Sequence, residues 1–241
     1  MTSINLSAPS PSFTAVWEFP SQLPDALNHG EISVALGDLG VFAGTPLSSG
    51  ERERAASMSS EEARLRFTAA RRLLRSVVSR WCAIPASDLK IIPDENGKPR
   101  LATPDPIHFS ITHSSECVAV AFSRSEVGID LECVRKVDAP ALARRFFSAE
   151  EACVCEHSAD HELFFRLWTC REAAIKGDGR GLSKLLGVTR VVSLNGGKED
   201  PMEVLIDEES WHAIPWKVDA ETHGALAFRN KPSLISWCDL R

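Results

Sequence analysis

Two carboxylates in a short apolar run are the first residues of this 241-residue chain whose types and spacing suit chemistry. Asp130 and Glu132 lie two positions apart in the sequence VGIDLE at 127–132. Alternate residues of a β-strand share one face, so a strand here would place both side chains together. Because like charges that close repel one another, we expect a cation between them. Both side chains offer oxygen ligands, and no nearby Cys or His has the spacing of a metal ligand, which favours Mg²⁺, with Mn²⁺ as the alternative.

A second pair, Glu172 and Lys176, is spaced one helical turn apart in the sequence FRLWTCREAAIK at 165–176. Mg²⁺ usually takes one or two protein carboxylates and fills its other positions with water and substrate phosphates. A site built from both pairs therefore predicts a phosphate or pyrophosphate substrate. Glu172 would complete the metal site or act as a general base on a hydroxyl group. Lys176 would offset the negative charge of a leaving phosphate.

Each pair also has an ordinary structural explanation. Glu172 and Lys176 alone would make an exposed salt bridge worth about a few tenths of a kcal/mol. Asp130 and Glu132 alone would be two surface carboxylates on an edge strand. The combination of the two pairs is more specific than either one, and it favours the metal-site hypothesis.

The composition is that of an ordinary globular protein, with 44% hydrophobic and 25% charged residues. A net charge of −6 argues against general nucleic-acid binding, and no apolar run approaches the roughly 18 residues of a membrane span. Residues 1–12 are rich in Ser and Pro and lack the pattern of a secretory signal, so we expect a flexible N-terminal tail. Seven scattered cysteines without a C-x-x-C pair fit a reducing, cytoplasmic environment.

The clearest helix is predicted at 59–82. Ser59-x-x-Glu62 is a typical helix start, and apolar residues then recur every three or four positions. Eight arginines and four glutamates lie between residues 51 and 80, so this segment is basic within an acidic chain. We expect most of these arginines on a solvated helix face. The alternative is an anion-binding patch, since Arg suits phosphate.

Short strands bounded by turn residues are predicted at 32–36, 107–111, 117–122, 188–194, 202–206, 216–218, 224–228 and 234–237. The dipeptide at 96–97, Asn-Gly, is a strong signal for a tight turn, and Asn195-Gly196 predicts another. His113 follows a predicted strand, where its side chain can reach a ligand.

Further helices are predicted at 140–147, from Ser148 onwards, and at 161–176, the last followed by a glycine-rich segment at 177–181. That segment is expected to stop the helix and form a flexible loop. Each half of the chain then contains a long helix followed by strands. We therefore predict an α+β fold with two similar halves, assigned to residues 13–124 and 125–241, the second carrying the metal site.

The motifs resemble those of Sfp-type 4′-phosphopantetheinyl transferases. That family has the signature pair G-I-D-x-E and W-[ST]-x-[KR]-E-[AS]-x-x-K, and this chain has GIDLE at 128–132 and WTCREAAIK at 168–176. Two upstream family elements are matched by NGKP at 96–99 and FSITHS at 109–114. Thr112 stands where the family usually has Ser, and Arg171 where Lys is common.

The resemblance implies two α+β halves with pseudo-twofold symmetry and an active site in the cleft between them, where coenzyme A binds. It implies transfer of the phosphopantetheine arm of coenzyme A to a serine of an apo acyl or peptidyl carrier protein, with release of adenosine 3′,5′-bisphosphate. By motif position, Asp130, Glu132 and Glu172 would hold Mg²⁺ on the pyrophosphate. Glu172 would also be the base for the carrier serine, and Lys176 would assist the leaving group.

The resemblance also assigns coenzyme A contacts. Lys98, Thr112 and His113 fall where the family contacts coenzyme A, with His113 near the 3′-phosphate. Arg66 falls near a family arginine that meets the same phosphate. The larger members of the family are usually monomers, so we expect a monomer here.

Two alternatives stay open. A metal-dependent hydrolase would cleave coenzyme A or another pyrophosphate with water and would need no carrier protein. A non-catalytic module would bind coenzyme A or a carrier protein without turnover. The sequence mark of such a module would be a lost carboxylate or lysine, and all four residues are present here.

Overall fold

A computed structural model describes residues 16–18, 24–103, 107–158, 162–192, 194 and 201–241. The described residues form an α+β fold with two five-stranded sheets and one two-stranded sheet. They divide into an N-terminal unit, Ala15–Ser125 with Pro232–Arg241, and a C-terminal unit, Glu126–Lys231. The tail predicted at 1–12 lies outside the described residues.

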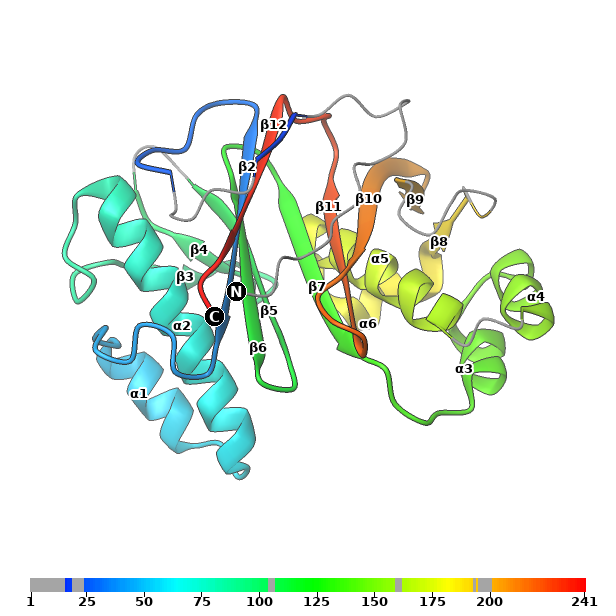
Figure 1. Cartoon of the computed structure of the whole chain (residues 1–241), viewed down its shortest axis with the longest axis horizontal. Helices are drawn as coiled ribbons and strands as arrows, with labels where there is room; N and C mark the ends of the chain where they lie inside the picture. The colour runs from blue at the N-terminus through cyan, green and yellow to red at the C-terminus, as the bar shows by residue number, and fades with distance from the viewer. Residues whose placement is uncertain (1–15, 19–23, 104–106, 159–161, 193, 195–200) are drawn as a thin grey trace. The chain divides into compact units, whose positions relative to one another are not determined.

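The sheet of the N-terminal unit combines local and distant strands (Figure 1). β2 (Glu31–Asp38) pairs antiparallel with β6 (Cys117–Ser123), which pairs antiparallel with β5 (His108–Ser114). On its other side β2 pairs in parallel with β12 (Leu234–Asp239), which borders β1 (Val16–Glu18). The division predicted from the sequence assigned the final residues to the second half, whereas their strand pairing places them in the sheet of the N-terminal unit.

Helix α2 (Glu61–Cys82) packs an apolar face on this sheet. Its buried residues Leu73 and Val77 share one core with Val120 and Phe122 of β6. The helix starts two residues later than predicted, because Ser60 accepts the hydrogen bond from the Ala63 amide that caps it. The remaining elements of this unit are α1 (Ser49–Ala56), β3 (Ile91–Pro93) and β4 (Pro99–Leu101).

The predicted turn at 96–97 joins β3 to β4, and Gly97 adopts a φ of 85°, which suits glycine. Several arginines of α2 form ion pairs within the unit. Arg80 pairs with Asp25 at the surface, and the buried Arg75 lies 2.6 Å from Glu51.

The C-terminal unit contains an all-antiparallel sheet in the order β7-β11-β10-β9-β8. Its strands are β7 (Val127–Cys133), β11 (Thr222–Phe228), β10 (Glu209–Lys217), β9 (Met202–Ile206) and β8 (Thr189–Val191). The turn predicted at Asn195-Gly196 lies outside the described residues.

Helix α5 (Glu162–Asp178) lies along one face of this sheet (Figure 1) and buries Leu167, Cys170 and Ala174 against it. The helix includes Gly177 and Asp178 and ends within the segment at 177–181, as predicted. Asp178 makes two ion pairs there. Asp178 lies 2.8 Å from Arg180 and 3.4 Å from Arg229.

The other helices of the C-terminal unit are α3 (Ala139–Phe146), α4 (Ala149–His157), α6 (Leu182–Leu185) and the 3₁₀ helix η1 (Leu186–Val188). Among the described residues, no helix is both long enough and apolar enough to cross a membrane. All seven cysteines are free thiols.

Candidate active site

Strand β7 and helix α5 approach closely because Gly128 has no side chain. A Cβ atom at this position would lie 1.8 Å from the carbonyl oxygen of Ala173 and 2.5 Å from the amide nitrogen of Gly177, both on α5. On the neighbouring strand β11, Ala227 is directly opposite Gly128. These small residues allow α5 to pack closely on one face of the sheet. Gly128 shares this face with every second residue of β7, including Asp130 and Glu132.

Three carboxylates meet on that face. Asp130 and Glu132 come from β7 and Glu172 from α5, and one oxygen from each lies within 4.8 Å of the other two. Asp130 is buried, whereas Glu132 and Glu172 are half-buried. The structure therefore brings together the three residues that were predicted from the sequence to share a metal site.

Lys176 faces the same group. Its Nζ atom lies 2.5 Å from Oδ1 of Asp130, a contact between side chains 46 residues apart in the sequence. The Lys176 side chain is 33% exposed and that of Asp130 only 3%, so the lysine supplies positive charge to a buried carboxylate from the edge of the site. This placement favours the site hypothesis over a simple surface salt bridge with Glu172.

The electrostatics of the site favour a bound positive charge. Burial, followed by the charge of Asp130, raises the pKa of Glu172 to about 7, although Lys176 and a hydrogen bond from Trp168 act in the opposite direction. Burial and Asp130 also raise the pKa of Glu132. Ionising all three carboxyl groups is therefore unfavourable unless a cation binds among them.

The donor set fits a hard divalent cation. All three side chains offer carboxylate oxygens, which Mg²⁺ and Mn²⁺ prefer. Their oxygens are close enough to surround one ion, and a dication would relieve the repulsion that raises the two glutamate pKa values.

The other residues of the motif at 168–176 hold the helix in place. Trp168 stacks on Phe164 with ring centroids 5.8 Å apart. Arg171 is buried and donates hydrogen bonds of 2.7 Å to Glu151 and to the carbonyl oxygens of Phe146 and Leu186. The charge at this position therefore stabilises the fold around α5, while Glu172 and Lys176 reach the site.

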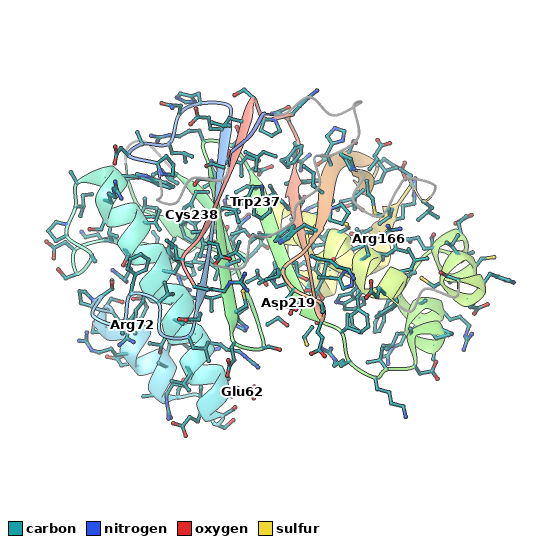
Figure 2. The ribbon with its side chains drawn as sticks, viewed as in Figure 1. Glu62, Arg72, Arg166, Asp219, Trp237 and Cys238 are labelled. Atoms are coloured by element: carbon teal, nitrogen blue, oxygen red, sulfur yellow. The ribbon has the colours of Figure 1, made fainter. Side chains whose placement is uncertain are left out.

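The predicted coenzyme A contacts lie in the N-terminal unit, and three of them gather near one turn. Thr112 is buried in β5, and the exposed His113 lies near the end of that strand. Arg66 extends from α2 to this turn, where its Nε donates a 2.7 Å hydrogen bond to the carbonyl oxygen of Ser115. It also pairs with Glu62, which is labelled in Figure 2.

Lys98 lies in the turn between β3 and β4, where its amide donates to Oδ1 of Asp94. That ribbon approaches β5 through Arg100, whose Nη1 atom lies 3.5 Å from Nδ1 of His108. The four predicted coenzyme A contacts thus belong to one unit and the carboxylate group to the other.

A model of the 4′-phosphopantetheinyl transferase superfamily matches residues 126–230, nearly the whole C-terminal unit. The chain is 36% identical over 148 residues to the 4′-phosphopantetheinyl transferase HetI of Nostoc sp., an alignment covering 58% of this chain and 62% of HetI. It is 35% identical over 159 residues to Sfp of Bacillus subtilis, covering 60% of this chain and 70% of Sfp. It is 33% identical over 162 residues to AcpT of Escherichia coli, covering 64% of this chain and 77% of AcpT. The chain belongs to the 4′-phosphopantetheinyl transferase family.

Family membership confirms the resemblance drawn from the two motifs. The matched region contains Asp130, Glu132, Glu172 and Lys176. The chain spans just under two thirds of the length of HetI, so the activity and substrates of the whole protein are taken up below as a proposal.

Two side chains beside the carboxylates in this family member escaped the sequence analysis. His223 of β11 is directly opposite Glu132 and is only 5% exposed. Glu162, at the start of α5, lies 3.7 Å from Nε2 of His223. Neither residue lies in the two signature motifs, and His223 meets Glu132 only through strand pairing between residues 91 positions apart in the sequence.

Proposed function

We propose that this chain is an enzyme that transfers the 4′-phosphopantetheine arm of coenzyme A to a serine of an apo acyl or peptidyl carrier protein and releases adenosine 3′,5′-bisphosphate. The meeting of Asp130, Glu132, Glu172 and Lys176 in one site carries the proposal. Its membership of the 4′-phosphopantetheinyl transferase family supports the same reaction.

Asp130, Glu132 and Glu172 would hold Mg²⁺, or Mn²⁺ as the alternative. When bound, the cation supplies positive charge that stabilises negative charge on the pyrophosphate during transfer. The protein contributes oxygen ligands that are already close together, two from a strand and one from a helix. The close contact at Gly128 fixes the helix on the strand. Little reorganisation of the chain is then needed at the moment of reaction.

Glu172 is the proposed base for the carrier serine. The serine oxygen would form a bond to the phosphorus that carries pantetheine, the bond from that phosphorus to the bridging oxygen would break, and the serine proton would pass to Glu172. In the metal-free protein, burial and the charge of Asp130 raise the pKa of Glu172 to about 7, and a base works best when its pKa lies near the working pH. Because a carboxylate bound to a cation is a weaker base, its two roles compete.

Lys176 is the proposed partner of the leaving group. Its ammonium group lies at the edge of the carboxylate cluster and is one-third exposed, so a departing phosphate can approach it. Its positive charge would stabilise the charge that develops on adenosine 3′,5′-bisphosphate.

Arg66, Lys98, Thr112 and His113 are proposed to bind coenzyme A, with Arg66 and His113 at the 3′-phosphate. The hydrogen bond from Arg66 to Ser115 supports this assignment, because it brings the guanidinium group to the turn that follows His113. A guanidinium group with free donor positions is well suited to phosphate.

A repeated arrangement supports the proposal that the two halves are related by a pseudo-twofold axis. In the N-terminal unit, Ser48 and Glu51 form a capping box, and Glu51 pairs with the buried Arg75 of α2. Arg75 also donates to two carbonyl oxygens, those of Ala86 and Leu89.

The C-terminal unit repeats each feature. Ser148 and Glu151 form a capping box, and Glu151 pairs with the buried Arg171 of α5, which donates to two further carbonyl oxygens. In both units the strand before the helices also pairs antiparallel with a strand that follows them. β2 pairs with β6 in this way, and β7 with β11. The placement of coenzyme A in a cleft between the halves stays a prediction, as do the monomeric state and the cytoplasmic location.

The test is incubation of the protein with coenzyme A, Mg²⁺ and a panel of apo carrier proteins from fatty-acid, polyketide and nonribosomal peptide systems. We expect at least one carrier to gain the mass of phosphopantetheine, and Glu172→Ala to abolish the gain. A panel without any gain, with wild type and Glu172→Ala alike, would contradict the proposal. Release of nucleotide without a carrier would favour the hydrolase, and binding without turnover the non-catalytic module.

A further inference from the structure

Helix α5 carries Glu172 towards the β7 carboxylates, so the geometry of the site depends on how firmly the helix is seated. Towards its C-terminal end the helix packs directly on Gly128, whose missing side chain lets Ala173 and Gly177 approach the strand. The contact between Lys176 and Asp130 lies in the same region. The middle of the helix packs apolar residues on the sheet. Any shift at its N-terminal end would be transmitted along the helix and would move Glu172 relative to Asp130 and Glu132.

A row of polar residues crosses the sheet farther along the same face. Glu132 of β7 is directly opposite His223 of β11, and His223 is directly opposite Lys217 of β10. Four residues along each strand, the corresponding row consists of the small residues Gly128, Ala227 and Ala213. Because side chains alternate between the faces of a sheet, the polar row and the small row lie on the face that α5 covers.

Glu162 joins the N-terminal end of α5 to the polar row. One oxygen of this carboxylate, Oε2, lies 2.6 Å from Nζ of Lys217 and 3.7 Å from Nε2 of His223. Directly opposed side chains on paired strands have Cβ atoms about 4.5–5.5 Å apart, so the His223 ring also borders Glu132. The nearly buried imidazole therefore borders one carboxylate of the metal-site group and the carboxylate that anchors the helix.

We propose that His223 is a positioning residue for the carboxylate group. It packs between Glu132 and Glu162, and Lys217 holds Glu162 at 2.6 Å, so the start of α5 is fixed beside the carboxylates while the close contact at Gly128 fixes the other end. The helix is thus held at both ends, and Glu172 is kept within reach of Asp130 and Glu132. This inference rests on the proposed function only in that the carboxylates bind a divalent cation, and it adds residues that no motif marks.

The test measures Mn²⁺ binding to the full chain by electron paramagnetic resonance of the free ion, without any turnover. Residues that orient metal ligands typically alter metal affinity by about 10–100-fold when removed. We therefore expect His223→Ala to weaken Mn²⁺ binding about tenfold, and Glu162→Gln to weaken it in the same direction. His223→Gln keeps a polar side chain of similar reach and is expected to recover most of the affinity.

The matched control is His212→Ala, which removes a histidine from β10 whose side chain lies on the other face of the sheet, 6.0 Å from the Phe228 ring. Thermal unfolding of each variant without metal shows whether it is folded. If His223→Ala does not fold, Glu162→Gln serves as the test variant in its place. Wild-type Mn²⁺ affinity in folded His223→Ala, or an equal loss in His212→Ala, would overturn the inference.

Absence of Mn²⁺ binding to the wild-type protein would overturn the inference as well. A carrier-transfer assay on the wild type separates this result from failure of the proposed function. If the wild type binds Mn²⁺ in a His223-dependent way but modifies no carrier, the positioning role stands and the transferase proposal fails.

Discussion

Lys176 and Asp130 form a contact that joins helix α5 to strand β7 beside the other two carboxylates, with 2.5 Å between Nζ and Oδ1. The aspartate is almost fully buried, so the lysine provides the positive charge that a buried carboxylate requires. A cation bound to the carboxylates would provide the same compensation. With a cation on Asp130, the Lys176 ammonium group is available to a leaving phosphate.

Replacing Lys176 should separate catalysis from metal binding. Lys176→Met removes a positive charge that competes with a cation for Asp130, so Mn²⁺ binding should be as tight as in the wild type or tighter. The same change should lower kcat for transfer by about 10²-fold, because stabilisation of the departing group is lost. Lys184→Met, on the short helix α6, is the control. Weaker Mn²⁺ binding in Lys176→Met would contradict this account.

The stability of the metal-free protein should depend on pH through Glu172. Folding raises the pKa of this carboxyl from 4.5 to about 7, so its contribution to stability is fully present below pH 4.5 and is lost as the pH rises through about 7. Glu172→Gln stays neutral at every pH. With chelator present, it should be more stable than the wild type by about 1–3 kcal/mol at pH 8, since each pKa unit is worth about 1.4 kcal/mol.

Near pH 4.5 the same two proteins should unfold at nearly equal temperatures. Thermal unfolding at both pH values checks this, with Glu221→Gln in an exposed turn as the control. An equal difference between wild type and Glu172→Gln at both pH values would show that repulsion among the carboxylates is not its source.

The buried ion pair between Arg171 and Glu151 should contribute to stability. Arg171→Met leaves the buried Glu151 carboxylate without its counterion and removes a donor from two carbonyl oxygens, so we expect a loss of about 3–5 kcal/mol in chemical denaturation. Arg190→Met breaks an exposed pair with Glu208 and should cost less than about 1 kcal/mol. Similar losses in the two variants would contradict the structural role assigned to Arg171.

Arg66 should recognise the 3′-phosphate of coenzyme A. Arg66→Ala should raise KM for coenzyme A about tenfold with little change in kcat, because a charge-assisted hydrogen bond is worth about 1.5–3 kcal/mol. With 3′-dephospho-coenzyme A as the substrate, wild type and variant should have similar KM values. Arg64→Ala is the control, because Arg64 lies two residues earlier on α2, points to a different side of the helix and pairs with Glu61. An equal rise in KM for both substrates would show that Arg66 acts elsewhere.

Local patterns in the sequence predicted much of the fold. The apolar repeat at 59–82 predicted α2, and the Asn-Gly dipeptide at 96–97 predicted the turn between β3 and β4. Both signals arise from a few neighbouring residues. The return of β12 to the sheet of the N-terminal unit has no such signal, since its partner β2 lies about two hundred positions earlier in the sequence.

The residues of the candidate site were likewise predicted where their pattern is local in the sequence. Asp130, Glu132 and Glu172 were predicted because each pair of site residues lies on one strand or one helical turn. The arginine at position 171 carries a charge that suggests chemistry, but its burial against Glu151 became visible only in the packed structure. His223 was missed because its neighbour Glu132 is brought to it by strand pairing alone.

The central claim is that the carboxylate group and Lys176 catalyse transfer to a carrier protein. The most direct measurement is the ratio of carrier modified, by mass spectrometry, to adenosine 3′,5′-bisphosphate released, with and without Mg²⁺. The account predicts a ratio of one, dependence on Mg²⁺, no nucleotide without the carrier, and neither product with Glu172→Ala. Nucleotide release without carrier modification, or full activity in Glu172→Ala, would contradict it.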